Sequence, residues 1–125
     1  MLELGSHVSA SGGVDKSIER ATTLEMTAFQ VFTKNANQWN AKPLDPAVIE
    51  RFREGITANP SIKAVVAHDS YLINLASPDD AAWNKSIDAL QCELERCDRG
   101  CQLGGAKWSR TREVEAHSLR LQGGL

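Results

Sequence analysis

Between the N-terminus and about residue 98, short apolar runs alternate with stretches in which apolar residues recur every three or four positions. The short runs cover residues 2–6, 27–32 and 62–67, and residues 27–32 are rich in the β-branched and aromatic side chains that favour strands. The intervening stretches have the spacing of amphipathic helices. The pattern therefore predicts three strands, each followed by a helix.

Start signals precede all three predicted helices. Gly12 and Gly13 break the chain before the first helix, and Asp45-Pro46 opens the second, since aspartate caps free N–H groups and proline suits the first helical position. Residues 77–80 repeat that signal with carboxylates that the helix dipole favours. The predicted apolar faces are Val14, Ile18, Ala21 and Leu24; Val48, Ile49, Phe52 and Ile56; and Trp83, Ile87, Leu90, Leu94 and Cys97.

Three successive strand-helix units with continuous apolar strands indicate an α/β protein whose parallel sheet is covered on both faces. Doubly wound sheets and (β/α)8 TIM barrels share this pattern. No Gly-x-Gly-x-x-Gly follows the first strand, which weighs against a dinucleotide-binding fold. In a barrel, function lies on loops after the strands, here at His7, residues 33–40 and residues 68–77.

Chemistry-bearing side chains follow the third predicted strand. His68 stands where that strand ends, and an imidazole there can hold a metal. Tyr71 and Leu72 add apolar surface to a loop that Asn74 and Ser77 keep polar, which suggests a binding surface. Taken alone, a histidine at the position of His68 is more often an ordinary polar residue than a ligand, and Tyr71 and Leu72 are more often packing residues than binding residues.

Composition narrows the classes of function. The net charge of −2 gives no global basic field, so any contact with nucleic acid must be local. The three cysteines, at 92, 97 and 101, form no disulfide framework and fit a reducing, cytoplasmic setting. The first residues lack a secretion signal and no long apolar run is present, so we expect no membrane association.

Four blocks of sequence resemble the N-terminal part of the endonuclease IV family, the zinc-dependent apurinic/apyrimidinic endonucleases. The blocks are residues 5–13, 32–35, 38–39 and 68–76, within a resemblance that runs from residue 1 to about 98. It implies a (β/α)8 barrel with a cluster of three zinc ions at the carboxyl face of the strands. It also implies incision of duplex DNA on the 5′ side of abasic sites during base-excision repair, by a water that zinc activates.

The resemblance also implies residue roles. His68 falls on the first zinc ligand, and Tyr71 and Leu72 fall on loop residues that enter the minor groove. Asn37 stands where some members carry an inserted arginine. Further DNA contacts are expected from Lys34, Asn35 and Gln38. We expect His7 to line the pocket, with loop hydrogen bonding as the alternative, and Trp39 to anchor its loop.

The segment 99–125 departs from this pattern. It holds five of the nine glycines and no isoleucine, and it offers neither a fourth buried strand nor the His-Pro-Gly loop that the family places there. Permitted codons for residues 108–114, TGG-TCN-CGC-ACC-CGG-GAA-GTN, yield Val-x-His-Pro-Gly-Ser when read from the last base of the first codon. We therefore expect a partial barrel domain over 1–98 and an irregular, non-homologous tail that a frameshift would explain.

Two rival functions remain at this level. A sugar-phosphate isomerase or epimerase would share the barrel and the metal-binding histidines, and a truncated product would be non-catalytic. Only His68 carries over as a ligand, and three units leave a strand edge unpaired. We therefore expect the chain alone to bind no stoichiometric zinc and not to nick DNA, although its expected partner is duplex DNA with abasic sites. No protein partner is evident.

Overall fold

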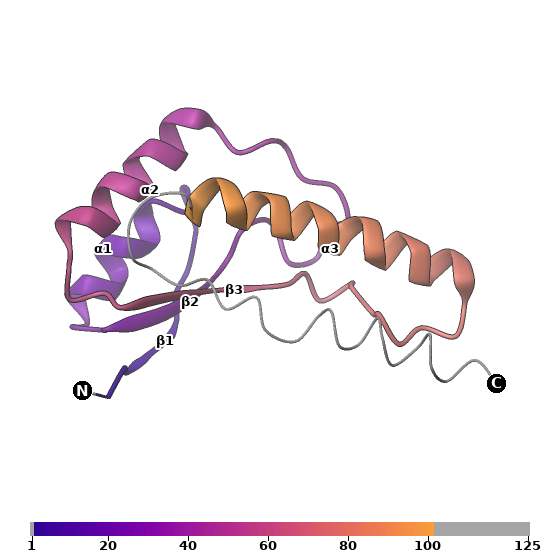
Figure 1. The fold of residues 1–125 in the computed structure, drawn as a ribbon, viewed down its shortest axis with the longest axis horizontal. Helices are drawn as coiled ribbons and strands as arrows, with labels where there is room; N and C mark the ends of the chain where they lie inside the picture. Colours follow the sequence, from indigo (N-terminus) through magenta and orange to yellow (C-terminus); the bar gives the residue numbers. More distant parts are fainter. Residues whose placement is uncertain (1, 102–125) are drawn as a thin grey trace.

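The computed structural model describes residues 2–101, and the predictions made for the segment beyond them lie outside the described residues. Strands and helices alternate along the chain (Figure 1). The elements are β1 (Gly5–His7), α1 (Lys16–Thr23), β2 (Ala28–Phe32), α2 (Pro46–Ala58), β3 (Ala64–His68) and α3 (Asp80–Cys101). The predicted order of strands and helices is confirmed.

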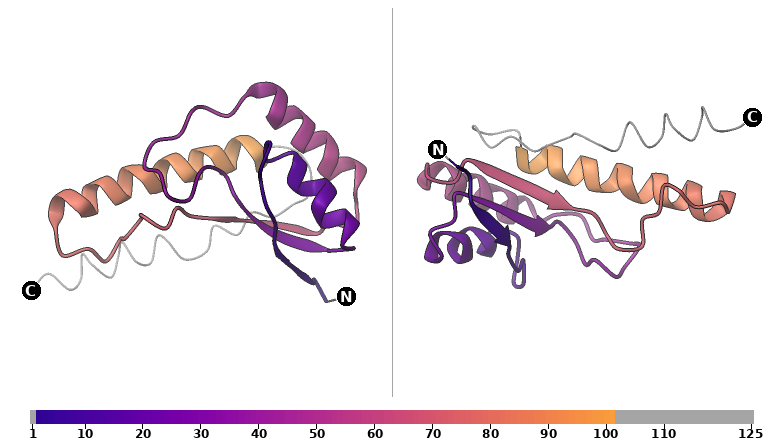
Figure 2. Two further views of the ribbon diagram at one scale, coloured as in Figure 1. Left: turned by 180° about the vertical axis from the view of Figure 1, so that it is seen from behind. Right: turned by 90° about the horizontal axis from the view of Figure 1, so that it is seen from below.

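The three strands form a parallel sheet in the order β1-β2-β3, with Ser6 opposite Phe29 and Phe29 opposite Val65. The helices lie along one side of this sheet, and α3 extends well past its edge (Figures 1 and 2). A doubly wound sheet has helices on both faces and a strand order that reverses. Strands that neighbour each other in sequence order, with all helices on one face, are instead typical of a (β/α) barrel.

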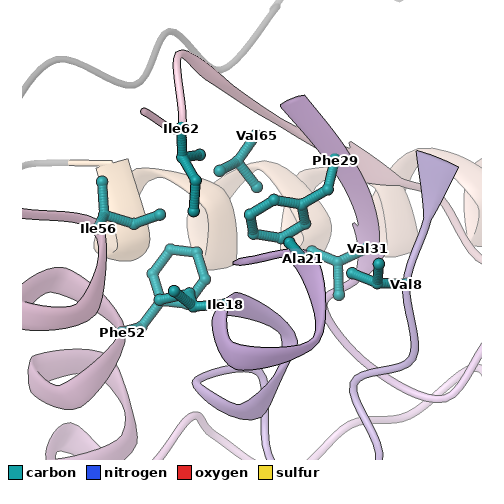
Figure 3. Close-up of a cluster of buried hydrophobic side chains, with 9 residues drawn as sticks. All are labelled: Val8, Ile18, Ala21, Phe29, Val31, Phe52, Ile56, Ile62 and Val65. Carbon is teal, nitrogen blue, oxygen red and sulfur yellow. The ribbon is translucent and has the colours of Figure 1, made fainter. Parts of the chain in front are cut away.

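The core lies between the sheet and the first two helices. Phe29, Val31 and Val65 project from the strands toward α1 and α2, and Val31 and Val65 are fully buried (Figure 3). The helices contribute Ile18 and Ala21 from α1 and Phe52 and Ile56 from α2. Burying each large apolar side chain contributes about 1.5–3 kcal/mol, so this cluster holds the three elements together.

Two of the three predicted helix starts, those of α2 and α3, are confirmed by capping hydrogen bonds. The Asp45 carboxylate accepts from the Ala47 N–H over 2.8 Å, and Pro46 occupies the first helical position. The Asp79 carboxylate accepts from the Ala82 N–H over 2.7 Å. Both side chains satisfy N–H groups that have no partner within the helix. These caps fix where each strand-end loop returns to the helical layer.

Three details of the prediction are wrong. The first strand begins at Gly5 rather than Leu2, and Leu2 and Leu4 are 74% and 62% exposed. Leu24 follows the end of α1 and is 65% exposed. The third strand begins at Ala64, after a turn that buries Ile62. Apolar runs show which residues are able to be buried, but tertiary neighbours decide which are.

We expected both faces of the sheet to be covered, but the described residues cover only the face that packs against the helices. Side chains alternate along a strand, so Gln30, Phe32 and His68 project to the opposite face, where they are only partly buried. A parallel barrel curves this face inward.

Among the described residues, no helix is long and apolar enough to cross a membrane.

Candidate functional site at the carboxyl end of the sheet

Four aromatic and imidazole rings gather where the strands end. His7, Phe32 and His68 are the last residues of β1, β2 and β3, and Tyr71 lies three residues beyond β3. The Phe32 ring centroid lies 4.7 Å from the centroids of both imidazoles and 5.3 Å from that of Tyr71. The Tyr71 and His68 centroids are 5.5 Å apart. We call these four side chains the ring cluster.

The strand register produces the ring cluster. Phe32 pairs with His68 in the parallel ladder, and His7 pairs with Gln30. Because alternate residues of a strand face the same side, Gln30 and Phe32 share a face with both histidines. The sequence therefore brings His7 and His68 together through β2.

The hydrogen bonds of the two histidines leave one nitrogen of each ring available. The His68 Nδ1 lies 2.7 Å from the Asp69 carbonyl oxygen, which only accepts, so Nδ1 carries the proton. The His7 Nδ1 lies 3.2 Å from the Gln30 side-chain oxygen and donates in the same way. In the neutral imidazole each Nε2 then keeps its lone pair, which is the usual state of a metal-ligating imidazole. The His7 bond joins the end of β1 to β2, and the pocket-lining role of His7 stays a prediction.

The loop after β3 displays Tyr71. Its side chain is 67% exposed, whereas Leu72 is half-buried. The Tyr71 N–H and the Ser70 hydroxyl both donate to the Ala36 carbonyl, over 2.9 and 2.7 Å. The loop after β2 therefore supports the loop that carries Tyr71, and an aromatic ring faces solvent beside His68.

The loop after β2 has a polar outer surface. Asn35, Asn37 and Gln38 are exposed, and the Asn35 side chain accepts from the Asn37 N–H over 2.9 Å. Lys34 differs, because its side chain is 2% exposed and its ammonium donates to the Gln38 carbonyl over 2.7 Å. The positive charge expected to meet DNA is thus directed into its own loop. Lys34, Asn35 and Gln38 line a cavity of about 500 Å³ that also touches Arg96.

Two charged residues of α3 were not singled out from the sequence. Glu93 is 3% exposed and accepts hydrogen bonds from both strand-end loops. The Arg96 guanidinium donates to the Thr33 and Lys42 carbonyls over 3.2 and 2.8 Å. The signal for Glu93 in the sequence is its position three residues after Leu90, on the face of the helix predicted to be apolar. The Lys85 ammonium lies 4.5 Å from the Trp39 ring centroid, so Trp39 also packs its loop against α3.

The part of the chain that the structure describes contains no group of three or more His, Cys, Asp or Glu side chains able to hold a metal ion. A catalytic zinc takes three protein ligands and keeps one position open. His68 fits one such position, through its Nε2. The described residues therefore contain no complete site for a catalytic zinc.

Parallel strands in sequential order, helices on one face and polar chemistry at the carboxyl edge define the first units of a (β/α) barrel. The model of the family described as xylose isomerase-like TIM barrel matches residues 18–106, and the chain belongs to this family. The match passes residue 98, the expected end of the barrel segment, and leaves that boundary a prediction.

Individual relatives confirm the resemblance to endonuclease IV. The chain is 47% identical over 97 residues to a probable endonuclease 4 of Chloroflexus aurantiacus, which covers 78% of this chain and 34% of the relative. A probable endonuclease 4 of Campylobacter fetus subsp. fetus is 46% identical over 99 residues, and this match covers 78% of this chain and 35% of the relative. The chain spans about a third of the length of these curated relatives.

A solved structure agrees with both the fold and the family. The crystal structure of endonuclease IV from Thermus thermophilus superposes with a TM-score of 0.74 at 33% identity, over 97% of this chain and 47% of that one. The barrel prediction is thus confirmed for the described units.

Proposed function

We propose that this chain forms part of the DNA-facing surface of a repair endonuclease that hydrolyses the phosphodiester 5′ to abasic sites in duplex DNA. In this proposal Tyr71 and Leu72 contact the minor groove, and Asn35, Asn37 and Gln38 contact the backbone. His7 lines the pocket and His68 is a metal ligand. A cytoplasmic location remains a prediction from cysteine usage.

The ring cluster is the observation that carries the proposal. It places an exposed phenol ring, 67% accessible, within 5.5 Å of an imidazole that keeps Nε2 available. Proteins that bend or open DNA insert apolar side chains between base steps, and nucleases of this kind work at a metal next to the opened site. An insertion residue beside a potential ligand suits a nuclease that must distort DNA before it cuts.

Zinc, when bound, would lower the pKa of a water molecule and neutralise charge on the phosphodiester. This chain contributes the His68 imidazole, oriented by the Asp69 carbonyl over 2.7 Å. The remaining ligands are not among the described residues, so the whole reaction requires more of a barrel than these units provide. The chain's own part is to hold DNA and to present one ligand.

The sugar-phosphate isomerase alternative receives less support. The family description includes xylose isomerase-like barrels, but the similar proteins named above are probable endonucleases. A small sugar substrate would be enclosed, whereas Tyr71 is exposed. The non-catalytic alternative has two forms: a DNA-binding module predicts salt-dependent binding of the abasic duplex without cleavage, and a truncated product predicts an unfolded circular dichroism spectrum.

A ¹⁵N NMR titration of the 125-residue chain with a short duplex carrying a tetrahydrofuran abasic analogue tests the proposal. We expect amide shifts to concentrate in loops 33–40 and 68–77 and to exceed those caused by the same duplex without the lesion. Tyr71→Ala should reduce them, because it removes the inserted ring. Leu24→Ala, which removes a comparably exposed apolar side chain from the end of α1, is the matched control and should leave them unchanged.

Equal shifts with intact and abasic DNA, or no effect of Tyr71→Ala, would count against the proposal. Shifts at the same loops with a ketose phosphate, but not with DNA, would favour the isomerase alternative. Nicking of the duplex is followed in the same samples.

A further inference from the structure

Glu93 lies at a buried junction between the two strand-end loops. Its Oε2 accepts from the Thr33 hydroxyl, directly after β2. Its Oε1 accepts from the N–H of Ser70, two residues after β3, over 3.3 Å and lies 3.8 Å from the Lys34 ammonium. One carboxylate on α3 thus contacts both loops of the candidate site.

Burial of a carboxylate is costly unless hydrogen bonds and an opposite charge compensate for the lost water. The neighbouring residues Ala89 and Leu90 of α3 are buried and apolar, so an apolar residue at position 93 would suit simple packing. Glu93 instead directs its acceptors to groups within two residues of the ends of two different strands. Arg96, one turn further along α3, adds a second attachment through its bonds to the Thr33 and Lys42 carbonyls.

Both loops are therefore attached to the same face of α3 as well as to each other. The direct attachment between them consists of the bonds that Ser70 and Tyr71 donate to the Ala36 carbonyl. The geometry points to Glu93 as a positioning residue: it sets the loop after β3 relative to the loop after β2, which keeps Tyr71 against Phe32 and His68. That this positioning matters for DNA binding rests on the proposed function. That Glu93 positions the loop carrying Tyr71 does not rest on it.

Tyr71 is the one tyrosine of the chain, so 3-fluorotyrosine gives a single ¹⁹F reporter in the loop after β3. We expect Glu93→Gln to move the ¹⁹F resonance or split it, because the amide cannot satisfy the Thr33 hydroxyl, the Ser70 N–H and the Lys34 ammonium together. Glu95→Gln makes the same chemical change at an exposed position of α3 and should leave the resonance unchanged. An unchanged resonance in folded Glu93→Gln would overturn the proposal.

A pair of Thr33 variants separates positioning from a general loss of structure. Thr33→Val removes the hydroxyl that donates to Glu93 and should move the ¹⁹F resonance in the same direction as Glu93→Gln. Thr33→Ser keeps a hydroxyl at this position, so its resonance should lie at the parent position. Ile18→Val loosens the core between α1 and α2 without touching either loop and should not move the resonance. If Glu93→Gln fails to fold, the Thr33 pair decides. An identical resonance in Thr33→Val, or the same displacement in Ile18→Val, would overturn the proposal.

A DNA titration then distinguishes this inference from the proposed function. If both hold, Glu93→Gln weakens binding of the abasic duplex roughly fivefold, within the coupling energies usual for groups in one network. If the resonance moves but neither the parent chain nor the variant prefers abasic DNA, the proposed function fails while the positioning role of Glu93 stands.

Discussion

The imidazole rings of His7 and His68 meet edge to face at the carboxyl ends of β1 and β3, with centroids 6.0 Å apart. Phe32, at the end of the intervening β2, lies 4.7 Å from each. Both rings use Nδ1 in a hydrogen bond and keep Nε2 available. The described residues therefore bring two imidazoles together at the candidate site, of which only that of His68 is proposed as a metal ligand, whereas a catalytic zinc takes three protein ligands.

We expect the 125-residue chain to retain less than one zinc per molecule after dialysis and to leave abasic duplex DNA intact. One imidazole, or even two, binds zinc too weakly to survive that treatment, and the described residues contain no cluster of three ligands. Metal analysis of the dialysed protein and a gel assay of labelled duplex measure both quantities. One retained zinc that disappears in His68→Asn, or metal-dependent nicking, would show that the ligand set is complete.

The sequence predicted the order of the elements because each depends on local patterns that the structure preserves. Asp45 and Asp79 cap helices as their positions indicate, and the spacing of Phe52 and Ile56 places both in the core. The exposure of Leu2 and Leu4 was not predictable, because an apolar side chain beside an edge strand is buried only if a neighbour covers it.

The site was predictable only in part, for a similar reason. Strand ends mark His7 and His68, but their meeting depends on the register with Gln30 and Phe32, which no local pattern encodes. Glu93 lies far along the chain from the loops it contacts, and the same contact draws Lys34 inward. Long-range hydrogen bonds of this kind leave little signal in one sequence beyond a charged residue on an apolar helix face.

Gly5→Ala should detach β1 from the sheet. A Cβ at position 5 would lie 1.5 Å from the Ala28 carbonyl oxygen, a backbone atom held in the ladder between β1 and β2. We expect a loss of about 2 kcal/mol or more in the free energy of unfolding, as for other changes that force backbone apart. Urea unfolding followed by circular dichroism measures it. The neighbouring Ser6→Ala is the control and should change stability by less than about 0.5 kcal/mol; equal effects would argue against the close approach.

Arg51→Gln should make the melting temperature depend less on pH in the acidic range. Burial raises the pKa of Asp15. The 2.8 Å hydrogen bond from Arg51 and its positive charge lower that pKa, and with the other lowering contributions they outweigh the effect of burial, so the pKa of Asp15 lies below its ordinary value. A carboxyl with a lowered folded pKa stabilises the fold above its unfolded pKa, and this contribution disappears as pH falls through the folded pKa. Arg51→Gln should therefore lower the melting temperature at pH 7 more than at pH 3. In an Asp15→Asn background the substitution should have no pH-dependent effect, and a pH dependence that survives there must come from another group.

Lys34→Met should test whether Lys34 serves the fold or the DNA. Its side chain and that of Glu93 are 2% and 3% exposed, with 3.8 Å between the ammonium and the carboxylate. Removing one partner of a buried ion pair costs roughly 3 kcal/mol, because the other charge is left without compensation, whereas removing both charges costs much less. We therefore expect Lys34→Met to lower the urea midpoint sharply and the double variant Lys34→Met/Glu93→Gln to recover most of it.

The double-mutant cycle from urea unfolding gives this coupling energy directly. The prediction from the sequence, that Lys34 contacts the DNA backbone, leads to a different result. A phosphate ligand at the surface would leave stability nearly unchanged when removed, and the dependence of DNA binding on salt would fall by about one counterion. Because the ammonium already donates to the Gln38 carbonyl over 2.7 Å beside Glu93, the structure favours the first result. Lys34 would then act on DNA only through the shape of the loop that presents Asn35, Asn37 and Gln38.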